Sequence, residues 1–222
     1  SNLNCLYLLK ENVATPSILS GKNVVKGNTA QSIELRDEAD FFSPVSFTAE
    51  QIRCYRTFTL AANGTSGWNT LFLPFDVSAV SCETLGNVDW FHSGSDTGKN
   101  FWLREYTGDA SNTVYFEEAS SLNAYTPYII AVPDGRWGDS WRMTNRLVTF
   151  SGSNAVIEPT GIATVSGNNY TFSGNTATTT VSKAYVLNNT GSSFEYDENA
   201  TTTAPFRAWF RDAEINSLAL PA

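Results

Sequence analysis

Short β-prone runs, regularly interrupted, are the feature that most constrains this chain. Runs rich in Val, Ile, Thr, Tyr, Phe and Trp alternate with clusters of Gly, Asn, Ser, Asp and Pro at a spacing of about 8 to 15 residues. This spacing is typical of a sandwich or a barrel, whose strands point alternate side chains to opposite faces. We therefore predict an all-β fold with an antiparallel β-sandwich or jelly-roll-like core.

Individual runs predict the strands of this core. The expected strands are 32–35, 55–60, 68–75, 101–106, 113–117, 128–132, 147–150, 163–165, 170–172, 178–181, 184–187, 194–196 and 205–210. The run 128–132 is apolar on both faces, which predicts a strand between two layers. Turn formers at 107–112 predict a hairpin loop, and separators rich in Gly, Ser and Asn at 151–154 and 173–175 predict further turns. A meandering antiparallel sheet follows from this pattern.

Helical patterning is scarce. Residues 48–53, where Thr48 and Gln51 have capping-box spacing, and residues 120–124 predict two short helices. The first segment of the chain, 1–56, has fewer aromatic residues and irregular turns. We expect it to form an N-terminal β module packed on the main sheet, with residues 57–222 forming the sandwich domain.

The charge balance excludes several classes of partner. The chain has 222 residues, with 14 Lys plus Arg against 22 Asp plus Glu, and a formal net charge of -8. Nucleic acid and anionic membranes are not expected partners, because both need a clustered cationic face. The apolar residues are too evenly spread for a membrane span. A folded domain with a sizeable core is expected instead.

Five stretches of the sequence carry a resemblance to a known group of proteins. They are Phe-Phe-Ser-Pro at 41–44 with Phe-Thr-Ala at 47–49, Gly-Trp-Asn-Thr-Leu-Phe-Leu-Pro-Phe at 67–75, Thr-Pro-Tyr-Ile-Ile at 126–130, Pro-Phe-Arg-Ala-Trp-Phe at 205–210 and Ile-Asn-Ser-Leu at 215–218. In this order they resemble uncharacterised secreted or cell-surface proteins of Bacteroidetes, over nearly the whole chain. Trp209 stands where that group usually has Tyr, which we interpret as a conservative packing change.

The resemblance implies a location but no chemistry. In that group the similar segment commonly forms the C-terminal domain of a longer exported protein. The chain is therefore expected to be secreted or on the outer cell surface. The shared stretches are turn and core patterns, so no functional residue is carried over from them.

Metal and disulfide chemistry find little support in the sequence. Cys5, Cys54 and Cys82 allow at most one internal disulfide, in any of three pairings, and we interpret them as buried small hydrophobic residues. One histidine and no CxxC or HxxxH pair predict no zinc site. The acidic segments 96–100 and 197–199 lack alternating calcium ligands and are interpreted as turns. No cofactor is expected.

The sequence gives equally little support for a catalytic site. His92 is the only histidine and lies beside aromatic residues, no Gly-x-Ser-x-Gly motif accompanies it, and no catalytic partner is identifiable from the sequence. Glu105, Glu117 and Glu118 lie near one predicted hairpin and keep a weak glycoside hydrolase open as an alternative. Acidic residues are routine on the solvated face of such strands. We therefore predict that the chain is not an enzyme.

The loop 134–142 is the segment most suggestive of binding. It follows a buried strand and carries two Trp, two Arg and two Asp. Flat aromatic rings stack on the apolar faces of sugars, while Asp and Arg bind hydroxyl groups. The candidate ligand-binding residues are Trp137, Trp141, Arg136 and Asp139, extended by Trp90 and Trp102. In the competing interpretation, which we favour, these Trp residues cap the open ends of the sandwich and donate their indole N–H to backbone carbonyls.

The functional prediction combines these points. We expect a non-catalytic binding or adhesion domain whose partner is a glycan or a host or surface protein. The alternative of a different class is a structural or assembly module that packs on upstream repeats, which a large exposed apolar area on the N-terminal segment would favour. The ligand and the oligomeric state stay open.

Overall fold

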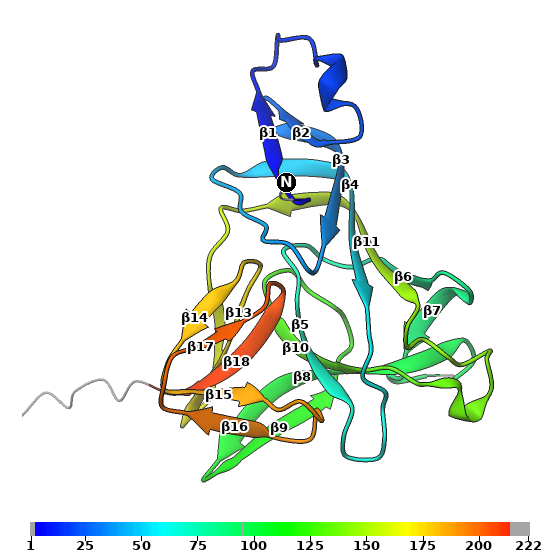
Figure 1. The fold of residues 1–222 in the computed structure, drawn as a ribbon, viewed down its shortest axis with the longest axis vertical. Coiled ribbons are helices and arrows are strands. Elements are labelled where there is room, and N and C mark those ends of the chain that lie inside the picture. Colours follow the sequence, from blue (N-terminus) through cyan, green and yellow to red (C-terminus); the bar gives the residue numbers. More distant parts are fainter. Residues whose placement is uncertain (1–2, 95, 214–222) are drawn as a thin grey trace, which may run out of the picture.

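The polypeptide folds almost entirely into β-strands. The computed structural model describes residues 3–94 and 96–213 (Figure 1). Within these ranges the only helices are two single 3-10 turns, η1 Ser17–Leu19 and η2 Gly135–Trp137. No helix of this part is long and apolar enough to span a bilayer. The all-β prediction is confirmed, while the stretch 215–218 lies outside the described residues.

The larger sheet has eleven strands. Their order is β1-β2-β3-β4-β11-β6-β7-β8-β10-β5, with β9 paired to β8 beside this path. Their bounds are β1 Leu6–Leu9, β2 Asn23–Lys26, β3 Thr29–Arg36, β4 Phe47–Thr57, β5 Trp68–Phe72, β6 Ala79–Cys82, β7 Gly86–Trp90, β8 Lys99–Ala110, β9 Thr113–Glu118, β10 Pro127–Ala131 and β11 Leu147–Ile157. The pairing is mainly antiparallel, but β1 with β2, β3 with β4 and β7 with β8 are parallel.

The smaller sheet has five strands in the order β12-β13-β18-β15-β16, and β14 with β17 forms a separate pair. Their bounds are β12 Ala163–Ser166, β13 Tyr170–Asn175, β14 Thr179–Val181, β15 Ala184–Leu187, β16 Phe194–Asp197, β17 Thr201–Thr203 and β18 Arg207–Asp212. The smaller sheet packs on β5, β8 and β10 of the larger one. A sandwich results.

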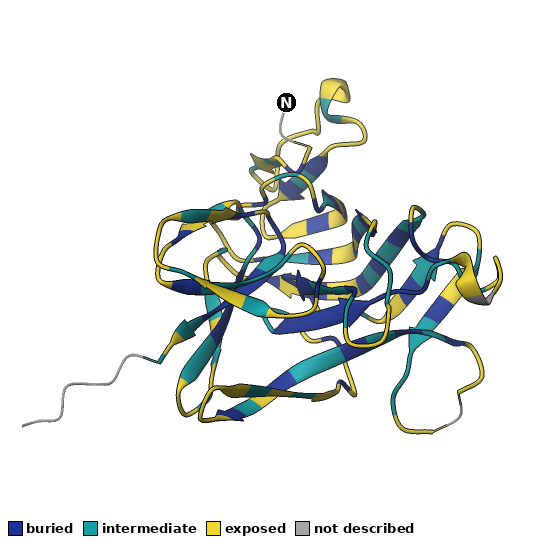
Figure 2. Cartoon of the chain, turned by 60° about the horizontal axis from the view of Figure 1, so that its bottom comes forward, coloured by how far each residue is buried: buried dark blue, intermediate teal, exposed yellow. Residues whose placement is uncertain are grey.

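The strands β5, β8 and β10 form the middle layer. Every residue of β10 is buried. Tyr128 and Ile130 enter a first core that the larger sheet encloses as it curves, whereas Ile129 enters a second core shared with the smaller sheet. Figure 2 shows these buried strands as the dark centre of the molecule. The prediction that 128–132 lies between two layers is confirmed.

The N-terminal strands extend the larger sheet. β4 pairs with β11 along most of its length, and β3 pairs with β4. In Figure 1, β1 and β2 lie at the tip of a projection from the body. The division at residue 56 stays a prediction, and β4 passes through this position as one continuous strand.

Both short helices predicted from the sequence are wrong. Residues 48–53 form the middle of β4, where Ala49 and Ile52 are buried. β3 and β11 satisfy the backbone of this segment from both sides, and this long-range pairing outweighs the local capping signal of Thr48 and Gln51. Residues 120–124 are a bend and a turn.

Two of the predicted turns are also wrong. Residues 151–154 lie inside β11, and 173–175 lie inside β13. A Cβ on Gly152 would lie 2.7 Å from the carbonyl oxygen of Asp76, and one on Gly174 would lie 2.2 Å from the ring of Phe72. These glycines mark close approaches between layers and not chain reversals.

The predicted hairpin is confirmed, with a tighter turn. β8 continues to Ala110 and β9 begins at Thr113, so the connection is Ser111 and Asn112. Ser111 has a φ of 54°, in the left-handed region that such a tight turn requires.

The cysteine interpretation holds for two residues of three. All three thiols are free; Cys54 and Cys82 are buried, on β4 and β6 to either side of β11. Burial raises the pKa of the Cys54 thiol. Cys5 is exposed and corrects the expectation; it directly precedes β1, the edge strand of the larger sheet, which has a neighbouring strand on one side only.

Candidate functional site

Trp68, the first residue of β5, lies at the centre of the candidate site. Its cross-strand neighbour on β10 is Ala131, which in turn faces Trp102 on β8. Because side chains alternate along a strand, Thr70, Ile129 and Arg104 form the next row on the same face of the middle layer. Part of this face is covered by the smaller sheet, and the rest is open.

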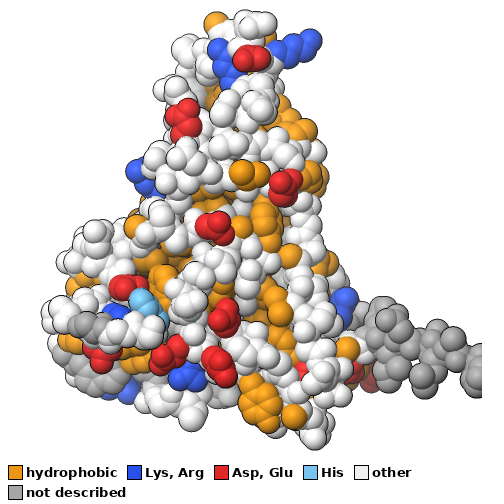
Figure 3. All heavy atoms as spheres, turned by 180° about the vertical axis from the view of Figure 1, so that it is seen from behind, with side chains coloured by type: hydrophobic (Ala, Val, Ile, Leu, Met, Phe, Trp, Pro, Cys, Tyr) orange, Lys and Arg blue, Asp and Glu red, His pale blue; other side chains and the backbone are white. Residues whose placement is uncertain are grey.

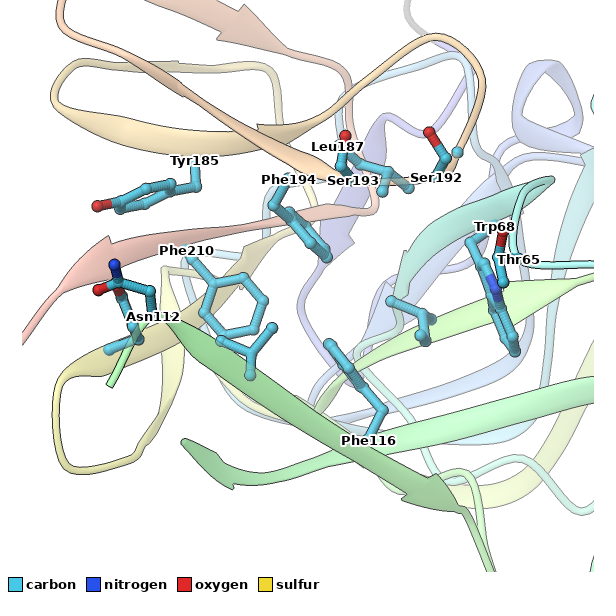
Figure 4. A pocket seen from close by; sticks show the side chains of 14 residues that line it. Thr65, Trp68, Asn112, Phe116, Tyr185, Leu187, Ser192, Ser193, Phe194 and Phe210 are labelled. Carbon is cyan, nitrogen blue, oxygen red and sulfur yellow. The ribbon is translucent and has the colours of Figure 1, made fainter. Parts of the chain in front are cut away.

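The inter-sheet pocket, between the two sheets, is the first opening at Trp68. It has a volume of about 560 Å³ and is lined by Thr65, Trp68, Asn112, Val114, Phe116, Ile129, Tyr170, Tyr185, Leu187, Gly191, Ser192, Ser193, Phe194 and Phe210. Figure 4 shows Phe116 reaching in from β9 and Phe194 from β16 on the other wall. Their ring planes are almost parallel, at 10°, with centroids 6.3 Å apart.

The second opening, which we call the Arg104 pocket, shares Trp68 with the inter-sheet pocket. Its volume is about 490 Å³, and its lining is Ala62, Asn63, Gly64, Ser66, Trp68, Trp102, Arg104, Ala131 and Arg136. Trp68 contributes to both pockets. The two pockets therefore meet at this side chain, and we refer to them together as the Trp68 groove.

Arg104 forms part of the wall of this groove. Its guanidinium carbon lies 5.3 Å from the centroid of the Trp68 ring. Its Nε is buried and has no acceptor among the described residues. Glu118 is its cross-strand neighbour on β9, yet the two side chains form no ion pair in the described part of the chain.

Arg136, which lines the same pocket, differs from Arg104 because its guanidinium has both an ion-pair partner and a hydrogen-bond acceptor. It forms an ion pair with Asp134 at 3.0 Å and donates to Asn63 Oδ1 at 2.9 Å. The hydrogen bonds from the backbone and then the side chain of Arg136 lower the pKa of Asp134. Arg136 thus ties η2 to the loop before β5.

The turn between β15 and β16 fixes the backbone of Trp68. Gly67 N donates to Thr190 O at 2.9 Å, and Trp68 N donates to Gly191 O at 3.1 Å. A Cβ on Gly191 would lie 2.2 Å from the carbonyl oxygen of Trp68, and its φ is 63°. Glycine is required here, so the smaller sheet and the central indole are held together.

A third, polar cleft of about 790 Å³ also reaches Trp68. Two of its lining residues, Arg56 and Arg207, share the carboxylate of Asp37 at 3.2 Å and 2.9 Å. Burial and the charge of Arg207 lower the pKa of Arg56 well below its usual range. This cluster joins β4, β18 and the segment after β3.

The structure places the six predicted ligand-binding residues in different surroundings. Trp102 and Arg136 line the Arg104 pocket together. Trp141 stacks on Phe91 with a centroid distance of 6.5 Å, and Phe91 in turn stacks on Trp102 at 5.3 Å. Asp139 is exposed and lies 3.8 Å from Arg146. Of Trp137 only the backbone lies within the described structure.

Trp90 behaves as the capping interpretation expects. Its indole N–H donates to Ala119 O at 2.7 Å, and its ring packs against the first core. It is therefore a wall of the sandwich and not part of the groove.

Sequence reasoning missed the central residues of the groove. Trp68 was assigned only to a core strand, and Arg104 was not singled out. A signal for Arg104 exists, because alternation places it between Trp102 and Tyr106 on one face of β8. A lone charge between two aromatic residues on the covered face of a strand marks an unusual position.

The carboxylates considered for glycoside hydrolysis do not share a pocket. Glu105 pairs with Glu117 across the hairpin, whereas Glu118 pairs with Arg104 and faces the other side. None of the three glutamates lines any pocket described above. Glu118 lies on the opposite face of the sheet from Glu105 and Glu117, because successive side chains of β9 point to opposite faces.

His92 has an acidic neighbour that the sequence did not reveal. Its Nε2 lies 3.2 Å from Asp89 Oδ2, and both side chains are partly exposed. Lys99 donates to the carbonyl oxygen of His92. These contacts hold the loop after β7.

Over residues 3–94 and 96–213, no three His, Cys, Asp or Glu side chains gather where a metal ion would bind. Comparisons of the chain with models of protein families, with curated proteins and with solved structures found no match. The resemblance to Bacteroidetes surface proteins stays a prediction.

Proposed function

We propose that this chain is a non-catalytic binding domain of a secreted or surface protein, and that it holds a glycan in the Trp68 groove. One observation carries the proposal: a single indole, Trp68, lines both the inter-sheet pocket, with its aromatic walls, and the Arg104 pocket, with its two guanidiniums. Successive sugars of a chain present apolar ring faces and hydroxyl edges, which suits such an arrangement.

The dimensions of the groove support this ligand class. Its pockets of about 560 and 490 Å³ fall in the range of small-molecule sites. Trp102 widens the aromatic surface beyond Trp68, and the loop residues Asn63 and Ser66 add hydrogen-bonding groups. An oligosaccharide of a few units would span both pockets.

The glycan proposal is tested by substituting the shared indole. The wild-type domain is screened on a glycan array, and hits are measured by isothermal titration calorimetry. We expect Trp68→Ala to weaken binding at least ten-fold, because it removes the stacking surface common to both pockets.

Trp141→Ala is the matched control, because Trp141 stacks on Phe91 but lines neither pocket. It should bind like the wild type. Circular dichroism melting verifies that both variants fold. Absence of any array hit, or equal loss of affinity in both variants, would contradict the proposal.

A second candidate, an assembly module, is supported by a separate observation on the N-terminal projection. Large apolar side chains are exposed there: Leu8 is 47% exposed, Val13 42% and Ile18 83%. Figure 3 shows hydrophobic side chains at the surface in this upper part of the molecule. β1 also lies at the open edge of the larger sheet. Edges of this kind can pair with another chain.

Light scattering after size exclusion tests the assembly candidate. Self-association that Ile18→Ser with Leu8→Lys abolishes would support it. A monomer at all concentrations, with no upstream domain bound, would count against it.

A further inference from the structure

Of the two guanidiniums that line the Arg104 pocket, that of Arg104 has no acceptor among the residues that the structure describes. A guanidinium carries five N–H donors and no acceptor of its own. Over the described residues the Arg104 side chain forms no hydrogen bond or ion pair, its guanidinium lies over the Trp68 ring, and its Nε is sealed from solvent. A buried donor left unpaired is costly, so a position of this kind is typical of a group that a ligand completes.

The charges around the Arg104 pocket leave a positive excess. Two guanidiniums line it, and Asp134 neutralises only that of Arg136. Glu118 faces the same side of the sheet as Arg104 without pairing with it. The whole chain has a formal charge of -8, so this local excess runs against the overall balance.

The orientation of Arg104 is also favourable for binding an anion. Packing over the Trp68 ring restricts the guanidinium, and a stacked guanidinium still presents N–H groups at its edge. A carboxylate accepts two such N–H groups in parallel, which gives shorter and stronger bonds than a hydroxyl group does.

We propose that the Trp68 groove selects an acidic glycan, with Arg104 binding the carboxylate of a uronic or sialic acid unit. The inference rests on the proposed function and specifies its ligand class. The sugar rings lie on Trp68, and the acid group accepts hydrogen bonds from the guanidinium of Arg104, which lines the pocket. Neutral glycans lack this contact and bind more weakly.

The test compares each acid with its own methyl ester, because esterification removes the charge and leaves the sugar unchanged. The array holds neutral oligosaccharides, a galacturonic acid tetramer and sialyllactose, the last two also as methyl esters. We expect the free acids to bind at least ten-fold more tightly than their esters. Raising the salt concentration should weaken binding of the acids more than binding of the esters.

Two variants test whether Arg104 causes the preference for the free acid. Arg104→Gln should lower the affinity for the acid to that of the ester and leave the affinity for the ester unchanged. Arg53→Gln changes the net charge equally, but Arg53 is exposed on β4, so this variant should keep the preference for the acid.

The outcomes separate the two proposals. Equal binding of acids and esters, or a preference for acids that survives Arg104→Gln, overturns the inference and leaves glycan binding intact. Binding to no member of the array overturns the glycan function and the inference with it.

Discussion

The hydroxyl of Tyr106 donates a hydrogen bond to Asp109 Oδ2 at 2.5 Å, on the same strand of the middle layer. The same carboxylate accepts from Asn169 N at 2.8 Å, from Asn169 Nδ2 at 2.7 Å and from Tyr170 N at 3.3 Å. One side chain of β8 thus holds the turn between β12 and β13. Tyr170 lines the inter-sheet pocket, so this contact also fixes part of the groove.

Asp109→Asn is therefore expected to destabilise the fold. An amide has one acceptor oxygen in place of two, and its NH₂ group would face the donors that now surround the carboxylate. We expect a fall of several degrees in Tm by calorimetry. Asp139→Asn, at an exposed position, is the control and should leave Tm unchanged.

The ionisation of Asp109 should also make the stability of the fold depend on pH. Burial alone would raise the pKa of Asp109, but the hydrogen bonds from Tyr106, Asn169 and Tyr170 outweigh it and lower the pKa. A lowered pKa in the folded state means that ionised Asp109 stabilises the fold above the unfolded value of about 3.9, and that this stability is lost as pH falls through the folded pKa.

Urea unfolding over a series of pH values measures this dependence. Below about pH 4 the wild type should lose stability more steeply than Asp109→Asn, which has no group to protonate there. Parallel curves for the two proteins would assign the acid sensitivity to other carboxylates.

The sequence predicts best where the local pattern and the final environment agree. The run 128–132 has no polar residue on either face, and β10 lies between two cores. The hairpin of β8 and β9 was predicted from turn formers next to two alternating runs, and its pairing is local.

Long-range neighbours explain what the sequence did not show. Gly152 and Gly174 are typical turn residues because glycine permits turns, yet each is needed for a close approach, of the Asp76 carbonyl oxygen to Gly152 and of the Phe72 ring to Gly174. The groove was missed for a similar reason. Whether Trp68 and Arg104 are open or covered depends on how far the smaller sheet extends over the middle layer, which no local pattern encodes.

Gly174→Ala tests the close-approach interpretation. Its Cβ would lie 2.2 Å from the ring of Phe72, which is fully buried and cannot move away easily. We expect a loss of about 1–3 kcal/mol in the free energy of unfolding, the usual cost of overpacking. Gly161→Ala is the matched control, because no atom lies within 4 Å of its added Cβ. Equal stability of the two variants would show that β13 does not pack on β5 this closely.

Thiol labelling tests the placement of the cysteines. Cys5 is exposed, whereas Cys54 and Cys82 are buried and unpaired. The raised pKa of Cys54 further suppresses its thiolate. A chromogenic disulfide reagent should label one thiol in the native protein and three in denaturant, in accord with three free cysteines. A total of one in denaturant would instead reveal a disulfide.

The last prediction concerns the carboxylate of Asp37, which Arg56 and Arg207 share. Arg56 is only 3% exposed and Arg207 26%, and within the described part of the chain Asp37 is the one carboxylate that pairs with either of them. Asp37→Asn leaves two neighbouring guanidiniums uncompensated, which should cost about 3–5 kcal/mol of unfolding free energy in a denaturant titration.

Arg207→Gln should cost less, because that residue is more exposed. In the Asp37→Asn background, Arg207→Gln should even be favourable, since it removes the charge repulsion that adds to burial in lowering the pKa of Arg56. Strict additivity of the two substitutions would show that the arginines do not interact through Asp37.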